Sequence, residues 1–378
     1  MLRVLQIGPA AASATSRGGM ATVMTIIMGH PDPRITCKAI ATYVDAGTAQ
    51  RLAVGVSGMI RSTLSLALGR FDILHVHLAK RGSFVRKALP VLAARAVGVP
   101  VVVHSHSPDF LVWFQQLSPV LQQLVRRTLQ VDKWIVLGSS FARDYAPALG
   151  IDRGDMDVLI NPVDLELAPT YDSGVRSGRI HVLSLGRLGR RKGSYDLVDA
   201  IAGMDRGLRE RLHVTIAGDG EVEGVGDAVA RAGLQDVITL PGWIGPAERE
   251  QLLADSSIFI LPSYGEGLPM ALMEALAAGK AVIITPVGGV PDVITDEVNG
   301  LLIPAGSPAA IATALGRLVE DADLRRRLGR AGRETAEIYS LDAWYAHLTD
   351  VWTSLVDQRR ARGRHRPALH WRAPAHRP

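Results

Sequence analysis

The order of apolar runs along the chain constrains its fold more than any other feature. Short apolar runs alternate with longer stretches of helical periodicity, and this alternation occurs in two successive series. The short runs are apolar on both faces, as strands are in a parallel sheet that helices cover on either side. The sequence therefore predicts an α/β protein with two doubly wound, Rossmann-like domains.

Each series supplies a set of expected strands and helices. In the first series, strands are expected at 2–8, 37–44, 72–78, 99–106 and 133–138, with helices at 20–29, 84–97 and 119–130. In the second, strands are expected at 180–186, 212–218, 237–240, 258–262 and 281–285, with helices at 195–204, 247–254 and 270–278.

The two series are separated near residue 165, where Pro, Gly and Ser interrupt the hydrophobic pattern. We expect an N-terminal domain over 1–165 and a C-terminal domain over 166–340. A last amphipathic helix, 341–358, is expected to pack back toward the N-terminal domain. The basic tail at 359–378 has little apolar surface and is expected to be disordered.

Cysteine usage and hydropathy bear on the compartment. Cys37 is the only cysteine, so no internal disulfide can form, and a reducing cytoplasm suits the chain. The most apolar window, 52–68, is interrupted by Arg61 and falls short of the roughly 18 apolar residues that indicate a membrane span. We therefore expect a cytoplasmic protein that does not cross a membrane.

The net charge of +5 is distributed unevenly along the chain. Residues 1–165 contribute +7, and residues 359–378, with seven arginines and no acid, contribute another +7. The middle of the chain contributes −9. Such asymmetry bears on binding partners rather than on the fold.

One stretch of the basic front half combines charge with apolar side chains. Lys80, Arg81, Arg86 and Lys87 surround Phe84. A basic amphipathic stretch favours docking on an anionic membrane, and we expect a peripheral position on the inner face of the cytoplasmic membrane. The alternative is a solvated basic face without such a partner. We expect no nucleic-acid partner.

The most specific motif is PSYGEGLPMALMEALAAG, residues 262–279. Glu266 and Glu274 lie eight residues apart across an expected strand-to-helix turn, in which Gly265 and Gly267 supply conformational freedom. Carboxylates on a loop and on the following helix can accept hydrogen bonds from two parts of one polyhydroxylated ligand. In the competing interpretation, Glu266 is an N-terminal carboxylate favoured by the helix dipole, and Glu274 is a solvated charge on the helix.

A second motif, LSLGRLGRRKG at 183–193, ends an expected strand at Gly186 and places Arg187 and Lys192 before a helix. Basic side chains beside a helix N-terminus suit a diphosphate, because the backbone N–H groups and the helix dipole already favour anions there. A solvated basic loop is the alternative.

The front half carries two further candidate pieces. Gly18 and Gly19 follow the first expected strand, where small residues let backbone N–H groups approach an anion; a plain strand-to-helix turn is the alternative. In VVVHSHSPDF, residues 101–110, His104 and His106 point to the same side of a strand. Because α/β sheets bind ligands at the carboxyl ends of their strands, we favour His106 and interpret His104 as structural.

Four motifs together resemble those of a known family. GRLGRRKG, AGDGE, PSYGEGLPMALMEALAAG and GGVPD, in this order and spacing, resemble the C-terminal donor domain of family 4 retaining glycosyltransferases of the GT-B fold. The resemblance covers roughly 160–300 tightly and the front half more loosely. It implies two Rossmann-like domains that face each other across a cleft. The N-terminal domain would bind the acceptor, and the C-terminal domain a nucleotide-sugar donor.

By motif match, the resemblance also implies a role for each matched residue. Glu266 contacts the donor sugar, and Glu274 contacts the nucleotide ribose. Arg187 and Lys192 hold the diphosphate, and His106 approaches the sugar and its leaving group. The expected catalytic residues are therefore His106, Glu266, Arg187 and Lys192. The other expected donor-binding positions are Gly18, Gly19, Gly186, Asp219, Gly242, Gly267, Leu268 and Glu274.

Three other patterns carry less weight. Asp155 and Asp157 match the D-x-D pattern that another glycosyltransferase class uses for a metal, but they lie between the expected domains. His75 and His77 would need further ligands to hold a metal, and no cysteine cluster supplies them. The first βα turn lacks G-x-G-x-x-G, which argues against a dinucleotide oxidoreductase. We expect no metal and no cofactor.

The expected activity is the transfer of a hexose-type sugar, with retention of configuration, from a UDP- or GDP-sugar to an acceptor hydroxyl. The expected acceptor is a lipid-linked or cell-surface polysaccharide intermediate. No side chain stands out as a covalent nucleophile, so front-face attack is expected. The alternatives are a GT-B-shaped nucleotide-sugar epimerase or phosphorylase, a transferase with a soluble small-molecule acceptor, and a non-catalytic nucleotide-binding module.

Overall fold

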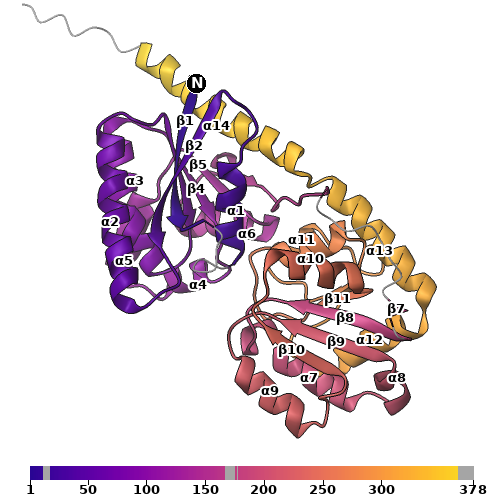
Figure 1. Cartoon of the computed structure of the whole chain (residues 1–378). Coiled ribbons are helices and arrows are strands. Elements are labelled where there is room, and N and C mark those ends of the chain that lie inside the picture. The colour runs from indigo at the N-terminus through magenta and orange to yellow at the C-terminus, as the bar shows by residue number, and fades with distance from the viewer. Residues whose placement is uncertain (12–17, 167–174, 177, 365–378) are drawn as a thin grey trace, which may run out of the picture.

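The computed structural model describes residues 1–11, 18–166, 175–176 and 178–364. These residues form two α/β domains, each built on one sheet with helices packed on it (Figure 1). The strand orders are β2-β1-β3-β4-β5-β6 in the N-terminal sheet and β10-β9-β8-β11-β12-β13 in the C-terminal sheet, with every pairing along them parallel. The expected pair of doubly wound domains is confirmed.

The N-terminal domain alternates strands with helices. Its strands are β1 (Leu2–Pro9), β2 (Ile35–Tyr43), β3 (Ile73–Leu78), β4 (Val101–Ser105), β5 (Lys133–Val136) and β6 (Met156–Val158). Its helices are α1 (Gly19–Met28), α2 (Thr48–Ala67), α3 (Gly82–Val97), α4 (Phe110–Gln115), α5 (Pro119–Thr128) and α6 (Ser139–Leu149). On β3, Leu74, Val76 and Leu78 enter the apolar core on one face of the sheet, and Ile73 enters the core on the other face, as in a strand buried on both sides.

The C-terminal domain repeats this plan. Its strands are β8 (Arg179–Leu185), β9 (Leu212–Ala217), β10 (Ile238–Gly242), β11 (Ile258–Leu261), β12 (Ala281–Ile284) and β13 (Leu301–Leu302), with the short β7 (Val175–Arg176) antiparallel to β8. Its helices are α7 (Ser194–Gly203), α8 (Arg206–Glu210), α9 (Val222–Arg231), α10 (Pro246–Asp255), α11 (Met270–Ala277), α12 (Pro308–Glu320) and α13 (Ala322–Glu337).

Several elements lie outside the expected set. The window around Arg61 forms α2, a helix of 20 residues that packs on the sheet through small residues such as Gly55 and Gly58. β6 and β13 have three and two residues, too few to produce a periodic signal. Among the described helices, none is both long and apolar enough to cross a membrane.

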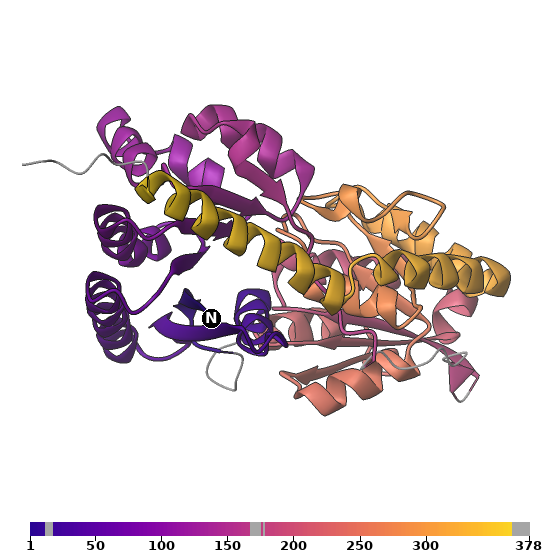
Figure 2. The same ribbon diagram turned by 90° about the horizontal axis from the view of Figure 1, so that it is seen from above.

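The last helix, α14 (Leu341–Arg364), leaves the C-terminal domain and runs across the N-terminal one (Figure 2). Trp344, Leu348 and Trp352 are buried in the core on one face of the N-terminal sheet. The Trp352 Nε1–H donates to His75 Nδ1 at 3.2 Å, and the Tyr345 hydroxyl donates to the Ile26 carbonyl at 2.7 Å. The helix thus ties the end of the chain to the first domain.

The expected boundary of the tail is wrong by six residues. Residues 359–364 continue α14 instead of starting a disordered segment. Arg359 packs so closely on the N-terminal domain that a side chain at Gly98 would collide with its guanidinium. Arginine and alanine are also favourable helix formers, so nothing stops the helix at 358. The rest of the predicted tail, 365–378, lies outside the described residues.

Replacing Trp352 with alanine should lower the free energy of unfolding by about 3–5 kcal/mol, because removal of a fully buried tryptophan leaves a cavity. Urea unfolding followed by fluorescence measures this change. Ser354→Ala, at an exposed position of the same helix, is the matched control and should shift stability by less than about 0.5 kcal/mol. Equal stability of the two variants would contradict the docking of α14.

Candidate functional site

The strand order of the C-terminal sheet brings two loops together. β8 and β11 are neighbours, but the chain continues from β8 to β9 on one side and from β11 to β12 on the other. Loops that leave such a switch point in opposite directions open a crevice beyond the carboxyl ends of the strands, where α/β proteins bind ligands. The two loops here are 186–192 and 262–269.

An ion pair joins these loops. Lys192 Nζ lies 2.6 Å from Glu266 Oε1, and only 7% of Glu266 is exposed. Arg191 adds a second cation, 3.7 Å from Glu266 Oε2. Gly186 gives the lysine room: its φ is 153°, and a Cβ there would lie 3.3 Å from Lys192 Nζ. The structure therefore brings together Gly186, Lys192 and Glu266 from the predicted set.

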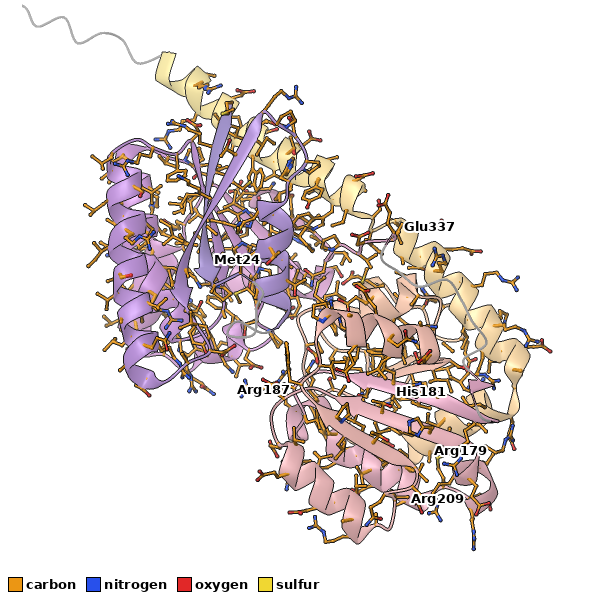
Figure 3. The ribbon with its side chains drawn as sticks, in the orientation of Figure 1. Met24, Arg179, His181, Arg187, Arg209 and Glu337 are labelled. Carbon is orange, nitrogen blue, oxygen red and sulfur yellow. The ribbon has the colours of Figure 1, made fainter. Side chains whose placement is uncertain are left out.

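Arg187 is exposed and points toward the N-terminal domain (Figure 3). It lines a pocket of about 400 Å³ beyond the carboxyl end of β8, together with Gly189, Gly220 and Glu221. Within the described residues, no carboxylate forms an ion pair with Arg187. The guanidinium is therefore available to an anion in this pocket.

Glu274 lies on α11 and faces α10. Its Oε1 is 3.1 Å from Arg249 Nη1, whereas its buried Oε2 has no hydrogen-bond partner among the described residues. Burial raises the pKa of Glu274, and the charge of Arg249 opposes that rise. An unpaired buried acceptor costs roughly 1–3 kcal/mol, so this carboxylate is suited to a further hydrogen-bond donor.

The two domains touch through backbone at glycines. A Cβ at Gly289 would lie 1.9 Å from the Leu137 carbonyl oxygen, and one at Gly267 would lie 2.8 Å from that of His106. Three hydrogen bonds reinforce the contact. They run from Ser139 N to Asp292 Oδ2 (2.9 Å), from Ser140 Oγ to Gly288 O (3.0 Å) and from Asn161 Nδ2 to Leu268 O (2.8 Å). Sequence reasoning missed Asn161 and also Gly138, where a Cβ would lie 2.6 Å from Gly289 Cα, since no motif marks them.

The predicted glycines of the front half also lie at this contact. Gly18 has a φ of 105°, and a Cβ at Gly19 would lie 3.2 Å from Met270 Cγ, at the start of α11. The start of α1 therefore faces the start of α11. The preceding residues 12–17 lie outside the described part of the chain.

Asp219 and Gly242 follow β9 and end β10, at the same edge of the C-terminal sheet. The Leu188 N–H donates to the Asp219 carbonyl at 2.6 Å, and the Gly218 N–H donates to the Gly242 carbonyl at 2.7 Å. Gly242 has a φ of 77°. Through its backbone carbonyl, Asp219 holds Leu188, which lines the pocket beside Arg187, whereas Gly242 holds Gly218.

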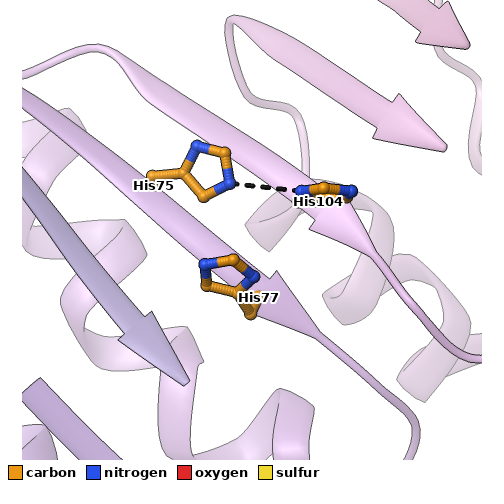
Figure 4. A group of neighbouring side chains, drawn as sticks. All are labelled: His75, His77 and His104. Atoms are coloured by element: carbon orange, nitrogen blue, oxygen red, sulfur yellow. Dashed lines mark hydrogen bonds between the residues drawn. The ribbon is translucent and has the colours of Figure 1, made fainter. Parts of the chain in front are cut away.

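Histidines form a polar row on the face of the N-terminal sheet that α1 and α14 cover. His75 and His77 lie on β3, while His104 is the last residue but one of β4 and His106 follows that strand. His75 Nε2 is 3.4 Å from His104 Nδ1 (Figure 4), and His77 Nδ1 is 3.0 Å from His106 Nε2. Burial lowers the pKa of His75 to about 3 and that of His106 to about 3, and holds the pKa values of His77 and His104 well below 6.5.

The two candidate histidines of β4 occupy different places. His104 is fully buried, whereas His106 is partly exposed and its carbonyl meets Gly267, next to Glu266. His106 is therefore the one that lies beside the C-terminal loops.

The row also offers metal-ligand atoms. Nitrogens of His75, His77 and His104 lie within 4.8 Å of one another (Figure 4), a grouping that the sequence missed because His104 comes from another strand. Both ring nitrogens of His75 and His77 take part in hydrogen bonds, and so does Nδ1 of His104. The Trp352 N–H donates to His75 Nδ1, which leaves the proton of a neutral His75 on Nε2. In this arrangement His75 has no free lone pair, because its Nδ1 accepts from Trp352 and its Nε2 carries the proton.

The D-x-D pair lies apart from the pocket. Asp157 Oδ1 is 3.0 Å from Lys133 Nζ, and Asp155 belongs to a short 3-10 turn at the surface. An ion pair thus accounts for the second aspartate.

The predicted basic stretch does not form one surface. Phe84 and Lys87 are buried, because a helix places residues three apart on the same face and this face packs on the sheet. Lys87 Nζ donates to Ser83 Oγ, and burial lowers the pKa of Lys87 to about 7. Lys80 pairs with Asp109, and Arg86 stacks over Tyr43 at 5.4 Å. Of the four predicted cations, only Lys80 and Arg81 are exposed. The prediction that this stretch forms a membrane-binding surface is therefore wrong.

The buried histidines predict acid sensitivity. Below pH 6.5 the unfolded chain protonates them while the folded protein keeps them neutral, so the unfolded state binds more protons and stability falls as pH falls. Each histidine should cost about 1.4 kcal/mol per pH unit until its folded pKa is reached. The urea midpoint should therefore drop steeply from pH 7 to pH 5, and less steeply in a His104→Gln variant. A midpoint independent of pH over this range would contradict neutral burial.

Both domains match families of known glycosyltransferases. Residues 35–167 match the family described as Glycosyltransferase Family 4, and residues 172–335 match Glycosyl transferases group 1. A "D-inositol 3-phosphate glycosyltransferase" of Streptomyces avermitilis is 25% identical, covering 89% of this chain and 78% of that protein. A "Phosphatidyl-myo-inositol mannosyltransferase" of Mycobacterium leprae is 28% identical over 82% of this chain and 80% of its own length.

Solved structures agree on the fold. The structure of Anabaena Alr3699/HepE in complex with UDP and glucose superposes with a TM-score of 0.74 at 16% identity, covering 94% of this chain and 100% of that one. The family matches, the curated relatives and this shared two-domain architecture lead to one conclusion: the chain is a glycosyltransferase and belongs to family 4 of the GT-B enzymes.

Proposed function

We propose that this glycosyltransferase is a retaining enzyme that takes its sugar from a nucleotide diphosphate donor bound in the crevice of the C-terminal domain. The observation that carries the proposal is the Lys192–Glu266 pair at the switch point of the sheet, with Arg187 beside it. The UDP and glucose named for the Anabaena structure support a donor of this class.

Arg187 and Lys192 are proposed to neutralise the diphosphate. Arg187 lines the pocket together with Gly189 and Gly220, and Lys192, which pairs with Glu266, lies on the same loop as Arg187. Charge-assisted hydrogen bonds to phosphate are about twice as strong as neutral ones. Because these cations supply the positive charge, we propose that the reaction needs no metal ion, and the rate should survive saturating EDTA.

The two glutamates are proposed to bind the rest of the donor. Glu266, held by Lys192 of the neighbouring loop, would accept from sugar hydroxyls. The unpaired Oε2 of Glu274 would accept from the ribose. When Lys192 turns toward the diphosphate, a hydrogen bond from a sugar hydroxyl would replace its contact with the Glu266 carboxylate.

The proposed chemistry is front-face transfer. The acceptor oxygen bonds to the anomeric carbon on the face from which the phosphate oxygen departs. The bond from that carbon to the phosphate oxygen breaks with its electron pair going to the diphosphate, and the acceptor proton passes to the departing oxygen. Arg187 and Lys192 stabilise the charge that develops on the leaving group. Glu266 is engaged by Lys192, which fits a binding role better than that of a covalent nucleophile.

We further propose a lipid-linked acceptor and a peripheral position on an anionic membrane, through a different surface from the predicted one. α2, α3 and α5 lie on one flank of the N-terminal domain (Figure 1) and contain no acidic residue. Large apolar side chains of α2 are 43–67% exposed. They are Leu52, Val56, Ile60 and Leu64, and Leu68 directly after the helix continues the row.

Cations flank this apolar surface. Arg51 and Arg61 lie on α2, Arg95 on α3, and Arg127 on α5, all exposed. An exposed apolar row combined with cations and without acids matches the interface of an anionic bilayer. The alternative is a soluble acceptor, which the inositol phosphate in the name of the Streptomyces avermitilis relative favours.

Nucleotide release from a panel of UDP- and GDP-sugars tests the activity. We expect fast release with one donor only when an acceptor is present, either a lipid extract or a soluble polyol phosphate. Conversion of the donor sugar without nucleotide release would indicate an epimerase instead. Tight nucleotide binding without turnover on any acceptor would indicate a binding module.

Replacing Lys192 or Arg187 with methionine should each weaken binding of the free nucleotide diphosphate by about 10- to 100-fold, because a charge-assisted hydrogen bond is lost. The double variant should lose less than the sum, since both cations meet one ligand group. Calorimetric titration with UDP and GDP measures this. Arg206→Met, at an exposed arginine on α8, is the control and should bind normally. Unchanged affinity in both single variants would remove the proposed clamp.

Replacing Ile60 with glutamate should reduce cosedimentation with phosphatidylglycerol vesicles by about tenfold, because a charge enters the apolar row. Ile338→Glu makes the same change at a still more exposed isoleucine of the C-terminal domain and should have no effect. Turnover of a soluble acceptor analogue should stay normal in both. If Ile60→Glu and the parent protein bind vesicles equally, another surface or a soluble acceptor applies. Deletion of 365–378 separates any contribution of the tail.

A further inference from the structure

Two separate hydrogen-bonded chains run through the histidine row, and only one of them reaches His106. The first runs from the Met24 carbonyl through Gln6 and His77 to His106. The second runs from Trp352 through His75 to His104. Gln6 comes from β1 and is fully buried, so the first chain crosses three neighbouring strands.

The first chain fixes the protons of its members. Gln6 Nε2 donates to the Met24 carbonyl at 3.0 Å, and a carbonyl can only accept, so the amide oxygen of Gln6 must face His77. That oxygen lies 3.1 Å from His77 Nε2, which therefore carries the proton. A neutral His77 then has a bare Nδ1, and this nitrogen accepts from His106 Nε2 at 3.0 Å. His106 is left with its proton on Nε2 and a lone pair on Nδ1.

The second chain ends without reaching the pocket. The Trp352 N–H can only donate, so His75 Nδ1 is bare and its Nε2–H points to His104 Nδ1. His104 Nε2 then carries a proton, and it is buried without a partner among the described residues. One hydrogen-bonded chain therefore orders His106, and the other ends at His104, so the second can serve as a control for the first.

His106 lies where the lone pair on its Nδ1 could accept a hydrogen bond from a ligand. His106 is partly exposed, its backbone N–H donates to the Leu78 carbonyl at 2.9 Å, and its own carbonyl abuts Gly267 beside Glu266. No described residue forms a hydrogen bond with His106 Nδ1. A lone pair that can only accept selects a hydroxyl group rather than a phosphate oxygen.

We infer that Gln6 and His77 are positioning residues that hold His106 as a neutral hydrogen-bond acceptor for a hydroxyl group of the sugar donor. This inference rests on the proposed donor site and adds how the histidine is kept in one tautomer. A histidine with the opposite tautomer would present an N–H to the same hydroxyl and would attract phosphate as well. The hydrogen-bonded chain through Gln6 and His77 therefore affects recognition of the sugar and leaves recognition of the nucleotide unchanged.

Nitrogen-15 NMR of the full chain labelled at histidine reads the tautomer without any substrate. We expect a protonated Nε2 and a bare Nδ1 for His106, with its signals identified from their loss in His106→Gln. Gln6→Met, which keeps the length of the side chain, should mix the two tautomers at His106. A protonated Nδ1 on His106 in the parent protein would overturn the inference, whatever the variants do.

Kinetics supplies the second readout. Gln6→Met should lower kcat/KM for the donor sugar about tenfold, as loss of a second-layer partner does at other ordered histidines, while the affinity for free UDP or GDP stays the same. Trp352→Phe breaks the other chain and should lower stability but leave kcat/KM unchanged. Equal losses of kcat/KM in the two variants, or a fall in nucleotide affinity with Gln6→Met, would reduce the row to a structural role. If no donor turns over in the parent protein, the proposed function fails, and the NMR result still decides the tautomer.

Discussion

Close backbone contact between the two domains is the constraint on which the rest of the structure depends. Where Gly267 meets the His106 carbonyl and Gly289 meets that of Leu137, no side chain fits between the domains. Each glycine lies in a loop at the carboxyl edge of its sheet, where parallel sheets present their loops. The contact thus sets the crevice of the C-terminal domain against the end of β4. It brings His106 beside the loop of Glu266, although these residues belong to separate domains.

The C-terminal helix reinforces this arrangement. α14 starts in the C-terminal domain and buries two tryptophans on the N-terminal sheet, on the same face as the histidine row. Trp352 of this helix donates to His75 of β3, so the helix that leaves the C-terminal domain is also a structural part of the N-terminal domain. α14 therefore holds the two domains together in addition to the backbone contacts at Gly267 and Gly289.

The sequence supports some of these findings directly and leaves others out of reach. Strand cores and the Lys192–Glu266 loops could be predicted, because buried parallel strands and glycine-rich turns carry local signals. The contact between His106 and Gly267 could not, since a glycine that admits another backbone looks like any turn glycine. Phe84 and Lys87 were expected at the surface, but the helical period turns both inward, where Lys87 pairs with Ser83. The apolar side of α2 gave no clear amphipathic period because its exposed face is itself apolar.

A proton NMR time course of the reaction tests the central claim most directly. The anomeric proton of the donor sugar is followed in a mixture of enzyme, donor and acceptor, together with the released nucleotide diphosphate. Retaining transfer predicts one new glycosidic signal of the same anomeric configuration as the donor, formed in step with one nucleotide per transferred sugar. A product of inverted configuration, or loss of the donor sugar without a new glycosidic bond, would contradict it.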